Sequence, residues 1–150
     1  MKKFILLLAL VFSSLCFNAQ SFTLTPNHLS IKVKDKDISG EFYRNILQLR
    51  EVPTPWGDHT PLPAVFFDLG NNQELHITQY AEPIKLHKFI HFAFSVADFD
   101  GYLEFLDKKG IEYGDFSGKN KKFQIRIDGV KQIYFQDPDG YWIEVNDART

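Results

Sequence analysis

The sequence predicts an α+β fold built from two copies of one βαβββ module, whose curved mixed sheets surround a cleft, with the helices on the outer face. Three observations predict it: an internal repeat, an alternating pattern at the start of each copy, and a helical pattern after it. The repeat sets His28 against His91, and both copies then have valine at +5, aspartate at +7 and +9, and phenylalanine at +14. A period of about 63 residues indicates a duplicated module rather than a solenoid.

Each copy opens with a strand in which every second residue is apolar: Leu29, Ile31 and Val33 in the first copy, and Phe92, Phe94 and Val96 in the second. This alternation is typical of a strand with one covered face. The helices that follow carry apolar residues at Ile38, Phe42 and Ile46, and at Phe99, Leu103 and Leu106. We expect Asp37 and Asp98 as N-caps and Gly110 just after the second helix.

Further strands are predicted at 49–52, 64–69 and 74–79 in the first copy, and at 112–113, 123–127, 133–135 and 141–145 in the second. Asn71-Asn72, Asp128-Gly129 and the sequence DPDG at 137–140 indicate turns. The second copy thus has one strand too many, unless 123–135 is a single hairpin arm broken at Gly129. Four prolines predict a loop over 53–63, which contains Trp56 and His59.

Composition narrows the class of protein. The chain has 150 residues, of which 44% are hydrophobic and 24% charged, so it can form a globular core. The net charge of −2 and pI of about 6.2 exclude the basic footprint of a nucleic-acid-binding protein. One cysteine excludes an internal disulfide framework and a multi-cysteine metal site. We expect a single domain over 20–150, with modules at about 26–80 and 88–147.

The N-terminus has the pattern of a secretory signal peptide over 1–19. Lys2-Lys3 precedes an apolar run at 4–12 that is too short to span a bilayer, and small and polar residues follow up to Ala19. Cleavage there would remove Cys16 and leave a thiol-free protein, which suits the periplasm or the exterior. Two alternatives stay open: Cys16 as the lipidated residue of a lipoprotein, and an N-terminal anchor helix. If the segment is a cleaved signal peptide, the mature protein has no membrane contact.

Four ionisable residues share one phase of the predicted strands: His28, His76, His91 and Glu144. His76, His91 and Glu144 each stand between apolar neighbours, so they face away from the apolar side of the sheet. His28 and His91 correspond in the repeat, and His76 and Glu144 both lie in the last strand of a module. Three imidazoles and a carboxylate suit a divalent ion such as Zn, Ni, Co, Mn or Fe(II).

Structural explanations compete with the metal site. A single histidine on a strand more often has a structural role, and a glutamate on an antiparallel sheet more often faces water. Glu74 is a rival to His76 because it lies two residues away on the same face. His59 and His87 are interpreted as surface or pocket-rim residues. The metal hypothesis rests on the shared phase and on the duplication of the pattern.

The segments HLSIKVKD with FYRNIL, FFDLGNNQELHI, HFAFSV and YFQDPDGYWIEV resemble the vicinal oxygen chelate superfamily, also called glyoxalase/bleomycin-resistance/dioxygenase proteins. They cover nearly all of 28–147. The resemblance implies two βαβββ modules around a metal cleft, with ligands at His28, His91 and Glu144. It places the family's fourth-strand ligand at His76 or Glu74. It also implies that two neighbouring oxygens of a substrate bind the metal.

Three functions follow from these expectations. The first is an exported, divalent-metal-dependent lyase, isomerase or epimerase acting on a small oxygenated substrate, in which Glu144 or Glu74 acts as the catalytic base. The second is a non-catalytic protein that binds an antibiotic or aromatic molecule in a pocket lined by Phe66, Tyr134 and Trp142. The third is an extradiol-type dioxygenase with His28, His91 and Glu144 as its ligand triad. A monomer and a homodimer both stay open, and in a homodimer the ligands could come from one or both subunits.

Overall fold

The computed structural model describes residues 25–57, 63–80, 82 and 85–148. The predicted signal peptide, Cys16 and His59 lie outside these residues. Within them the chain forms eight strands and two helices, in the same order in each half. No described helix has the length and apolarity needed to cross a membrane.

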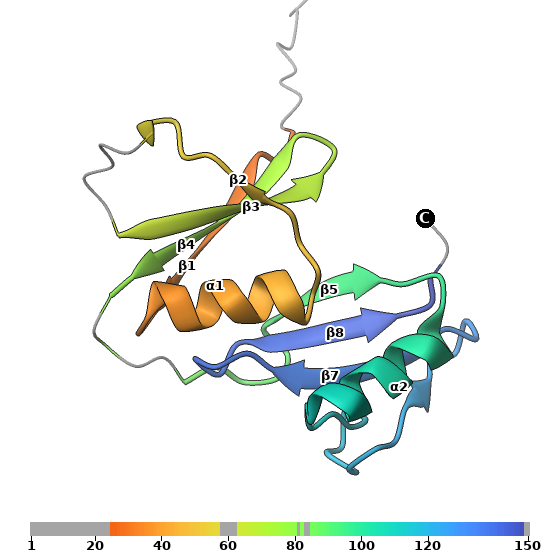
Figure 1. Cartoon of the computed structure of the whole chain (residues 1–150). Helices are drawn as coiled ribbons and strands as arrows, with labels where there is room; N and C mark the ends of the chain where they lie inside the picture. The colour runs from red at the N-terminus through yellow and green to blue at the C-terminus, as the bar shows by residue number, and fades with distance from the viewer. Residues whose placement is uncertain (1–24, 58–62, 81, 83–84, 149–150) are drawn as a thin grey trace, which may run out of the picture.

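The two halves have the same topology (Figure 1). The first contains β1 (His28–Val33), α1 (Lys36–Asn45), β2 (Glu51–Val52), β3 (Ala64–Gly70) and β4 (Gln73–Gln79). The second contains β5 (His91–Ser95), α2 (Phe99–Lys109), β6 (Gln124–Ile125), β7 (Lys131–Gln136) and β8 (Trp142–Asn146). The sheet orders are β1-β4-β3-β2 and β5-β8-β7-β6, each with one parallel pair at one edge and antiparallel pairs elsewhere. The predicted α+β fold of two βαβββ modules with mixed sheets is therefore confirmed.

The helix ends agree with the sequence at two of three predicted positions. Asp98 caps α2 by accepting the N–H of Gly101 at 3.0 Å, and Gly110 ends that helix in the left-handed conformation at φ 69°. The cap of α1 is Asp35, not Asp37, and its carboxylate accepts the N–H groups of Asp37 and Ile38 at 2.9 and 3.1 Å. Both aspartates precede the apolar pattern, and Asp35 is selected because β1 ends two residues earlier. Asp37 then lies in the first turn, where the helix dipole favours a negative charge.

The surplus strand of the second module is not formed. Residues 112–113 lie in an extended connection, and the neighbouring Gly114 makes only isolated bridges with Tyr134 and Asn120. A side chain at position 114 would place its Cβ 2.6 Å from the carbonyl oxygen of Lys119. The chain turns back at Gly118, whose φ is 89°, so no ladder continues beyond this crossing. Each sheet therefore has four strands.

Each helix covers one face of its own sheet and leaves the other face open. The covered face of the first sheet buries Ile31, Val33, Phe67, Leu75 and Ile77 with Tyr43 of α1. The covered face of the second buries Ile133, Phe135, Ile143 and Val145 with Phe99 and Leu106 of α2. The predicted position of the helices needs one refinement, because α1 lies between the two sheets (Figure 1) and its Phe42 packs against both cores.

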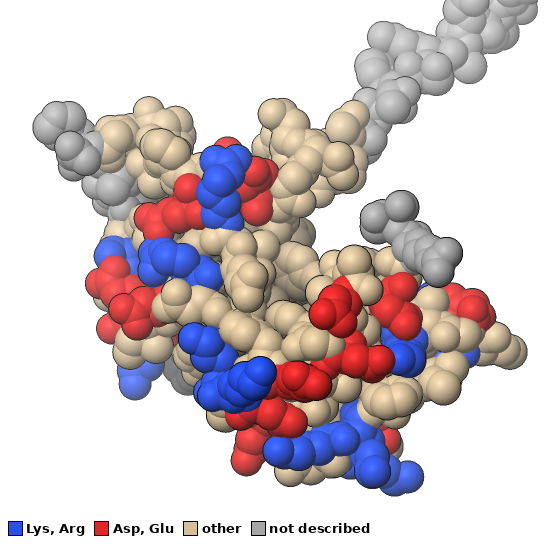
Figure 2. All heavy atoms as spheres, turned by 45° about the vertical axis from the view of Figure 1, so that its right-hand side comes forward, with Lys and Arg blue, Asp and Glu red and all other residues tan. Residues whose placement is uncertain are grey.

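The DPDG turn between β7 and β8 joins the two modules. Asp137, which is 5% exposed, accepts the hydroxyl of Tyr43 at 2.9 Å. Asp139 accepts the hydroxyl of Ser39 and the backbone N–H of Lys34, both at 2.6 Å. The turn of the second module is thus bonded to α1 and to the connection between β1 and α1 in the first. The face of the molecule in Figure 2 carries acidic and basic side chains intermixed.

Candidate functional site

The strand register shows which residues correspond in the two open faces. In the first sheet, His76 of β4 pairs with Ser30 of β1 and Phe66 of β3. In the second sheet, Glu144 of β8 pairs with Ala93 of β5 and Tyr134 of β7. Ser30 and Ala93 each lie two residues after the histidine that begins the edge strand. His76 and Glu144 are therefore equivalent, as the sequence predicted, and so are His28 and His91.

The second sheet brings His91 and Glu144 together. His91 Nε2 lies 3.3 Å from Glu144 Oε2, and the glutamate is only 6% exposed. The same Oε2 accepts the hydroxyl of Tyr134 at 2.5 Å, and Oε1 accepts the amide of Asn146 at 2.8 Å. These two donors hold the carboxylate in one orientation. Burial and the adjacent Glu144 carboxylate raise the pKa of Tyr134, so its hydroxyl stays a donor.

The other nitrogen of His91 is fixed by the backbone. Nδ1 lies 2.7 Å from the carbonyl oxygen of Lys88, and a carbonyl can only accept, so Nδ1 carries a proton. In the neutral imidazole this leaves the lone pair on Nε2, the atom that faces Glu144. A second hydrogen bond that sets the tautomer is typical of histidines that bind metals. Nε2 and Oε2 form an ion pair when His91 is protonated and become two adjacent donors for a cation when it is neutral.

The first sheet brings His28, His76 and Glu74 together. The rings of His28 and His76 stack with centroids 4.4 Å apart and planes 12° apart, and Phe66 stacks on His76 at 3.7 Å. His76 Nε2 lies 2.8 Å from Glu74 Oε2, and His28 Nδ1 lies 2.7 Å from the side-chain oxygen of Asn27. The two candidates for the fourth ligand position, Glu74 and His76, are therefore hydrogen-bonded to each other.

The four predicted ligands therefore lie in two pairs, one on each sheet. Across residues 25–57, 63–80, 82 and 85–148, no group of three or more His, Cys, Asp or Glu side chains is close enough to hold a metal ion. The chemistry of each pair fits a divalent ion, because imidazole nitrogen and carboxylate oxygen are the donors that such ions take. A common centre for all four side chains stays a prediction.

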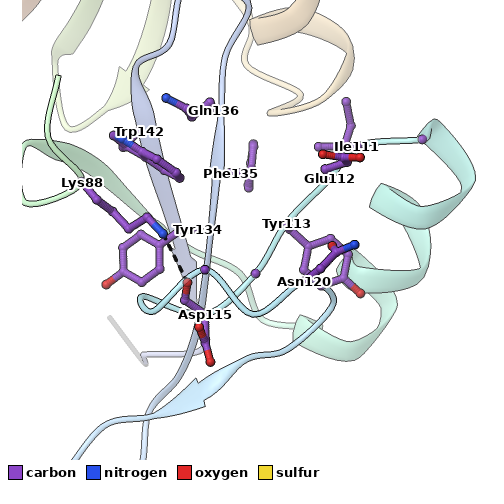
Figure 3. Close-up of a pocket in the computed structure, with 13 residues that line it drawn as sticks. Lys88, Ile111, Glu112, Tyr113, Asp115, Asn120, Tyr134, Phe135, Gln136 and Trp142 are labelled. Atoms are coloured by element: carbon purple, nitrogen blue, oxygen red, sulfur yellow. Dashed lines mark hydrogen bonds between the residues drawn. The ribbon is translucent and has the colours of Figure 1, made fainter. Parts of the chain in front are cut away.

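A cavity of about 490 Å³ lies beside the second sheet (Figure 3), and Tyr134, which donates to Glu144, is one of its lining residues. Trp142 and Tyr134 line it, as the binding-protein hypothesis predicted, together with Lys88, Gln136 and the connection that follows α2. Phe66 is not among its lining residues, because it is buried beneath the ring of His76 on the other sheet. His87 is exposed near this region, as expected.

Sequence reasoning missed two residues of this region. Asn146 follows Glu144 by two residues on the same strand, so the alternation of side chains could have placed it on the open face. Lys88 precedes β5 in a segment without regular structure, and no periodicity marks it. Tyr134 was expected only as a pocket residue, and it also holds Glu144.

Comparison with known proteins places this fold in a family. The model of the Glyoxalase/Bleomycin resistance protein/Dioxygenase superfamily matches residues 25–145. Metallothiol transferase FosB of Shouchella clausii (strain KSM-K16) is 27% identical over 122 residues, which are 80% of this chain and 77% of that protein. FosB of Staphylococcus epidermidis (strain ATCC 12228 / FDA PCI 1200) is also 27% identical, over 129 residues, with 80% and 79% covered.

Solved structures agree. Oxidase ChaP-H2 superimposes with a TM-score of 0.69 and 25% identity, covering 85% of this chain and 96% of that one. The fosfomycin resistance protein FosX of Listeria monocytogenes, solved as a point mutant with Mn(II) and 1S,2S-dihydroxypropylphosphonic acid, has a TM-score of 0.68 at 20% identity, with 86% and 95% covered. At that identity the likeness shows the fold alone. From the family match and the two-module architecture, the chain belongs to the glyoxalase/bleomycin resistance/dioxygenase superfamily.

Proposed function

We propose that this chain is a divalent-metal-dependent enzyme that transforms a small oxygenated molecule. The observation that carries the proposal is the arrangement of Glu144. It is a buried carboxylate whose oxygens are held by Tyr134 and Asn146, and it faces the Nε2 of a histidine whose Nδ1 is fixed by the backbone. Burying a carboxylate is costly, and an adjacent cation offsets that cost.

We further propose that two copies of the chain complete each metal site. His28 and His91 each begin the strand at one edge of a sheet, so both pairs lie where a second molecule can approach. In a twofold dimer, the first-sheet pair of one subunit can meet the second-sheet pair of the other. The ligands would be His28, His91 and Glu144, with His76 or Glu74 as the fourth.

The reaction class follows from the groups around the pairs. A bound divalent ion would polarise a substrate oxygen and stabilise negative charge there. The pair of Glu74 and His76 joins a carboxylate to an imidazole at 2.8 Å, and this is a suitable group to accept and return a proton. This combination supports a lyase, isomerase or epimerase. Thiol transfer to a small molecule is the second candidate, because both FosB relatives are metallothiol transferases.

Metal analysis combined with subunit mixing tests the site. One variant carries His28→Ala with His76→Ala, and the other carries His91→Ala with Glu144→Gln. Each variant alone should lose stoichiometric metal. After unfolding and refolding together, random pairing in a twofold dimer should restore about a quarter of the wild-type sites, because half of the dimers are mixed and each has one intact site.

Two results would contradict the proposal separately. A wild-type protein that binds no stoichiometric divalent ion removes the metal-dependent function. A wild-type protein that binds metal, with mixtures that bind no more than the separate variants, removes the shared site and places it within one chain. His87→Ala is the matched control, because this exposed histidine belongs to neither pair and its loss should leave metal content unchanged.

The reaction is then identified by assaying the metal-loaded protein with 2-oxoaldehydes, 2-hydroxy acids, catechols with Fe(II), and fosfomycin with a thiol. Turnover of the first two supports a lyase, isomerase or epimerase. Conversion of fosfomycin with consumption of the thiol supports the second candidate. Oxygen uptake with catechol would replace both with a dioxygenase.

Export is also proposed, on the n-region, apolar run and small residues at 1–19. When the full sequence is expressed, the product should be recovered from the cell envelope or the medium with an N-terminus near Gln20. Recovery from the cytosol with Met1 or Lys2 at the N-terminus would contradict this.

A further inference from the structure

The cavity beside the second sheet contains one lysine in an unusual setting. The ammonium of Lys88 lies 4.2 Å from the ring centroid of Trp142 and 5.7 Å from those of Phe116 and Tyr134. Figure 3 shows Lys88 beside Trp142 and Tyr134. It donates to the backbone carbonyl oxygens of Phe116 at 3.1 Å and Asp115 at 3.4 Å. Contact with three aromatic faces favours the charged ammonium form.

Lys88 has no carboxylate within ion-pair distance among the residues that the structure describes. The ammonium has three N–H donors, and the two carbonyl groups accept two of them. Lys88 is half-buried, and the carboxylate whose charge acts on its ammonium belongs to Asp115, which also lines the cavity. Asp115 forms no ion pair with Lys88 in the described structure, so the third N–H of the ammonium can be donated to an anion.

The position of Lys88 connects it to the proposed metal site. Its carbonyl oxygen accepts the N–H of His91 Nδ1, and one of the three rings near its ammonium belongs to Tyr134, whose hydroxyl donates to Glu144. The cavity that Lys88 lines measures about 490 Å³, within the usual range for small-molecule pockets of roughly 300–1,000 Å³. Glu112 and Asp115 also line the cavity, so Lys88 is its positive group beside two acidic ones. A molecule in this cavity would contact Tyr134, the residue that holds Glu144.

We infer that Lys88 binds an anionic group of the substrate, a carboxylate or a phosphonate, so that the enzyme acts on small oxygenated acids. This inference rests on the proposed function for its reaction, but the anion contact itself requires no metal. A second role for Lys88 is to fasten the chain at 115–116 to the second sheet through the two carbonyl contacts. That role alone would not distinguish an anion from a neutral molecule of the same shape.

Binding of simple probes to metal-depleted protein tests the inference. Protein stripped over a chelating resin is titrated with acetate, methylphosphonate and the neutral acetamide, at constant ionic strength. The fluorescence of Trp142 reports binding in a Trp56→Phe background, since that ring lies 4.2 Å from the Lys88 ammonium and these are the two tryptophans of the chain. Acetate and methylphosphonate separately probe carboxylate and phosphonate recognition.

We expect the wild type to bind one or both anions and to discriminate against acetamide. Lys88→Met should weaken anion binding at least about tenfold, because a hydrogen bond to a charged group contributes more than one power of ten in affinity. Lys88→Arg, which keeps the charge, should retain more binding than Lys88→Met. Lys85→Met is the matched control, because it removes the same charge from an exposed position in the same segment and should change nothing.

Equal anion binding by Lys88→Met and Lys85→Met would overturn the inference, as would acetamide binding as tightly as acetate to the wild type. If Lys88→Met does not fold, the wild-type discrimination and the Lys88→Arg titration decide. Because no metal is present, a failure of the metal proposal leaves this result unchanged. Conversely, a protein that binds metal but does not prefer anions would contradict the anion-binding role of Lys88 and leave the metal-dependent function standing.

Discussion

Tyr43→Phe removes a single hydroxyl from the junction between the two modules. Tyr43 is fully buried, and its hydroxyl donates to the buried carboxyl of Asp137. The other oxygen of that carboxyl accepts the backbone N–H groups of Tyr141 and Asp139 at 2.8 and 3.0 Å. Phenylalanine fills the same space but leaves Asp137 without the hydroxyl donor. A hydrogen bond to a charged group contributes about 1.5–3 kcal/mol, so we expect a loss of about 2 kcal/mol in the free energy of unfolding at pH 8.

The destabilisation caused by Tyr43→Phe should increase with pH, because it depends on the ionisation of Asp137. Burial raises the pKa of Asp137 above its ordinary value, and the Tyr43 hydroxyl opposes this by favouring the carboxylate. A carboxyl with a raised pKa in the folded state contributes stability that is fully present below its unfolded pKa and is lost as pH rises through the folded pKa. Tyr43→Phe raises the folded pKa further, so the stability lost with rising pH increases. Near pH 4.5 the cost should be smaller, about 1 kcal/mol for a neutral hydrogen bond.

Urea denaturation followed by tryptophan fluorescence at pH 4.5 and pH 8 measures both costs. Tyr80→Phe is the matched control, because Tyr80 is 55% exposed, and surface substitutions usually stay within about 0.5 kcal/mol. The reasoning is refuted if Tyr43→Phe is no more destabilising than Tyr80→Phe. It is also refuted if the cost of Tyr43→Phe is the same at both pH values.

Three further predictions concern the second module. Asp98→Ala removes the cap of α2 and should cost about 1 kcal/mol in thermal or urea denaturation, whereas an unchanged midpoint would show that the cap contributes nothing. Gly114→Ala places a Cβ 2.6 Å from the carbonyl of Lys119, so it should destabilise the protein by about 1–3 kcal/mol, and a neutral effect would contradict the close crossing of these chains. Tyr134→Phe removes a donor to Glu144 and should weaken divalent-metal binding in calorimetry about 10–100-fold with the fold preserved, while unchanged affinity would separate Tyr134 from the site.

The architecture could be predicted because the same strand and helix pattern occurs in both copies of the repeat. The alternation at the start of each copy and the caps at Asp98 and Gly110 are local signals, and local forces decide them. The cap of α1 was predicted two residues late, since Asp35 and Asp37 carry the same side chain and the end of β1 selects between them. The strand expected at 112–113 failed for a non-local reason, because that segment meets β7 at a single position.

The pairing within the candidate site was only partly predictable. Equivalence of His76 with Glu144 follows from the repeat, and the strand register agrees with it. Separation of the four side chains into two pairs depends on how the modules pack, and no sequence periodicity encodes that packing. Lys88 escaped prediction because it lies outside the strands and reaches the cavity by a long flexible side chain.

His76 and Glu144 each have an aromatic neighbour on the adjacent strand, and the kind of aromatic residue matches the ligand beside it. Phe66 offers a flat apolar ring on which the His76 imidazole rests, whereas Tyr134, at the corresponding place, offers a hydroxyl to the Glu144 carboxylate. A glutamate introduced alone at position 76 would sit on a phenyl ring that has no proton to give. The type of ligand in each module therefore depends on residues of two adjoining strands. Replacing His76 by glutamate in the first module requires Phe66→Tyr in the same variant, so that the new carboxylate has a hydroxyl to hold it.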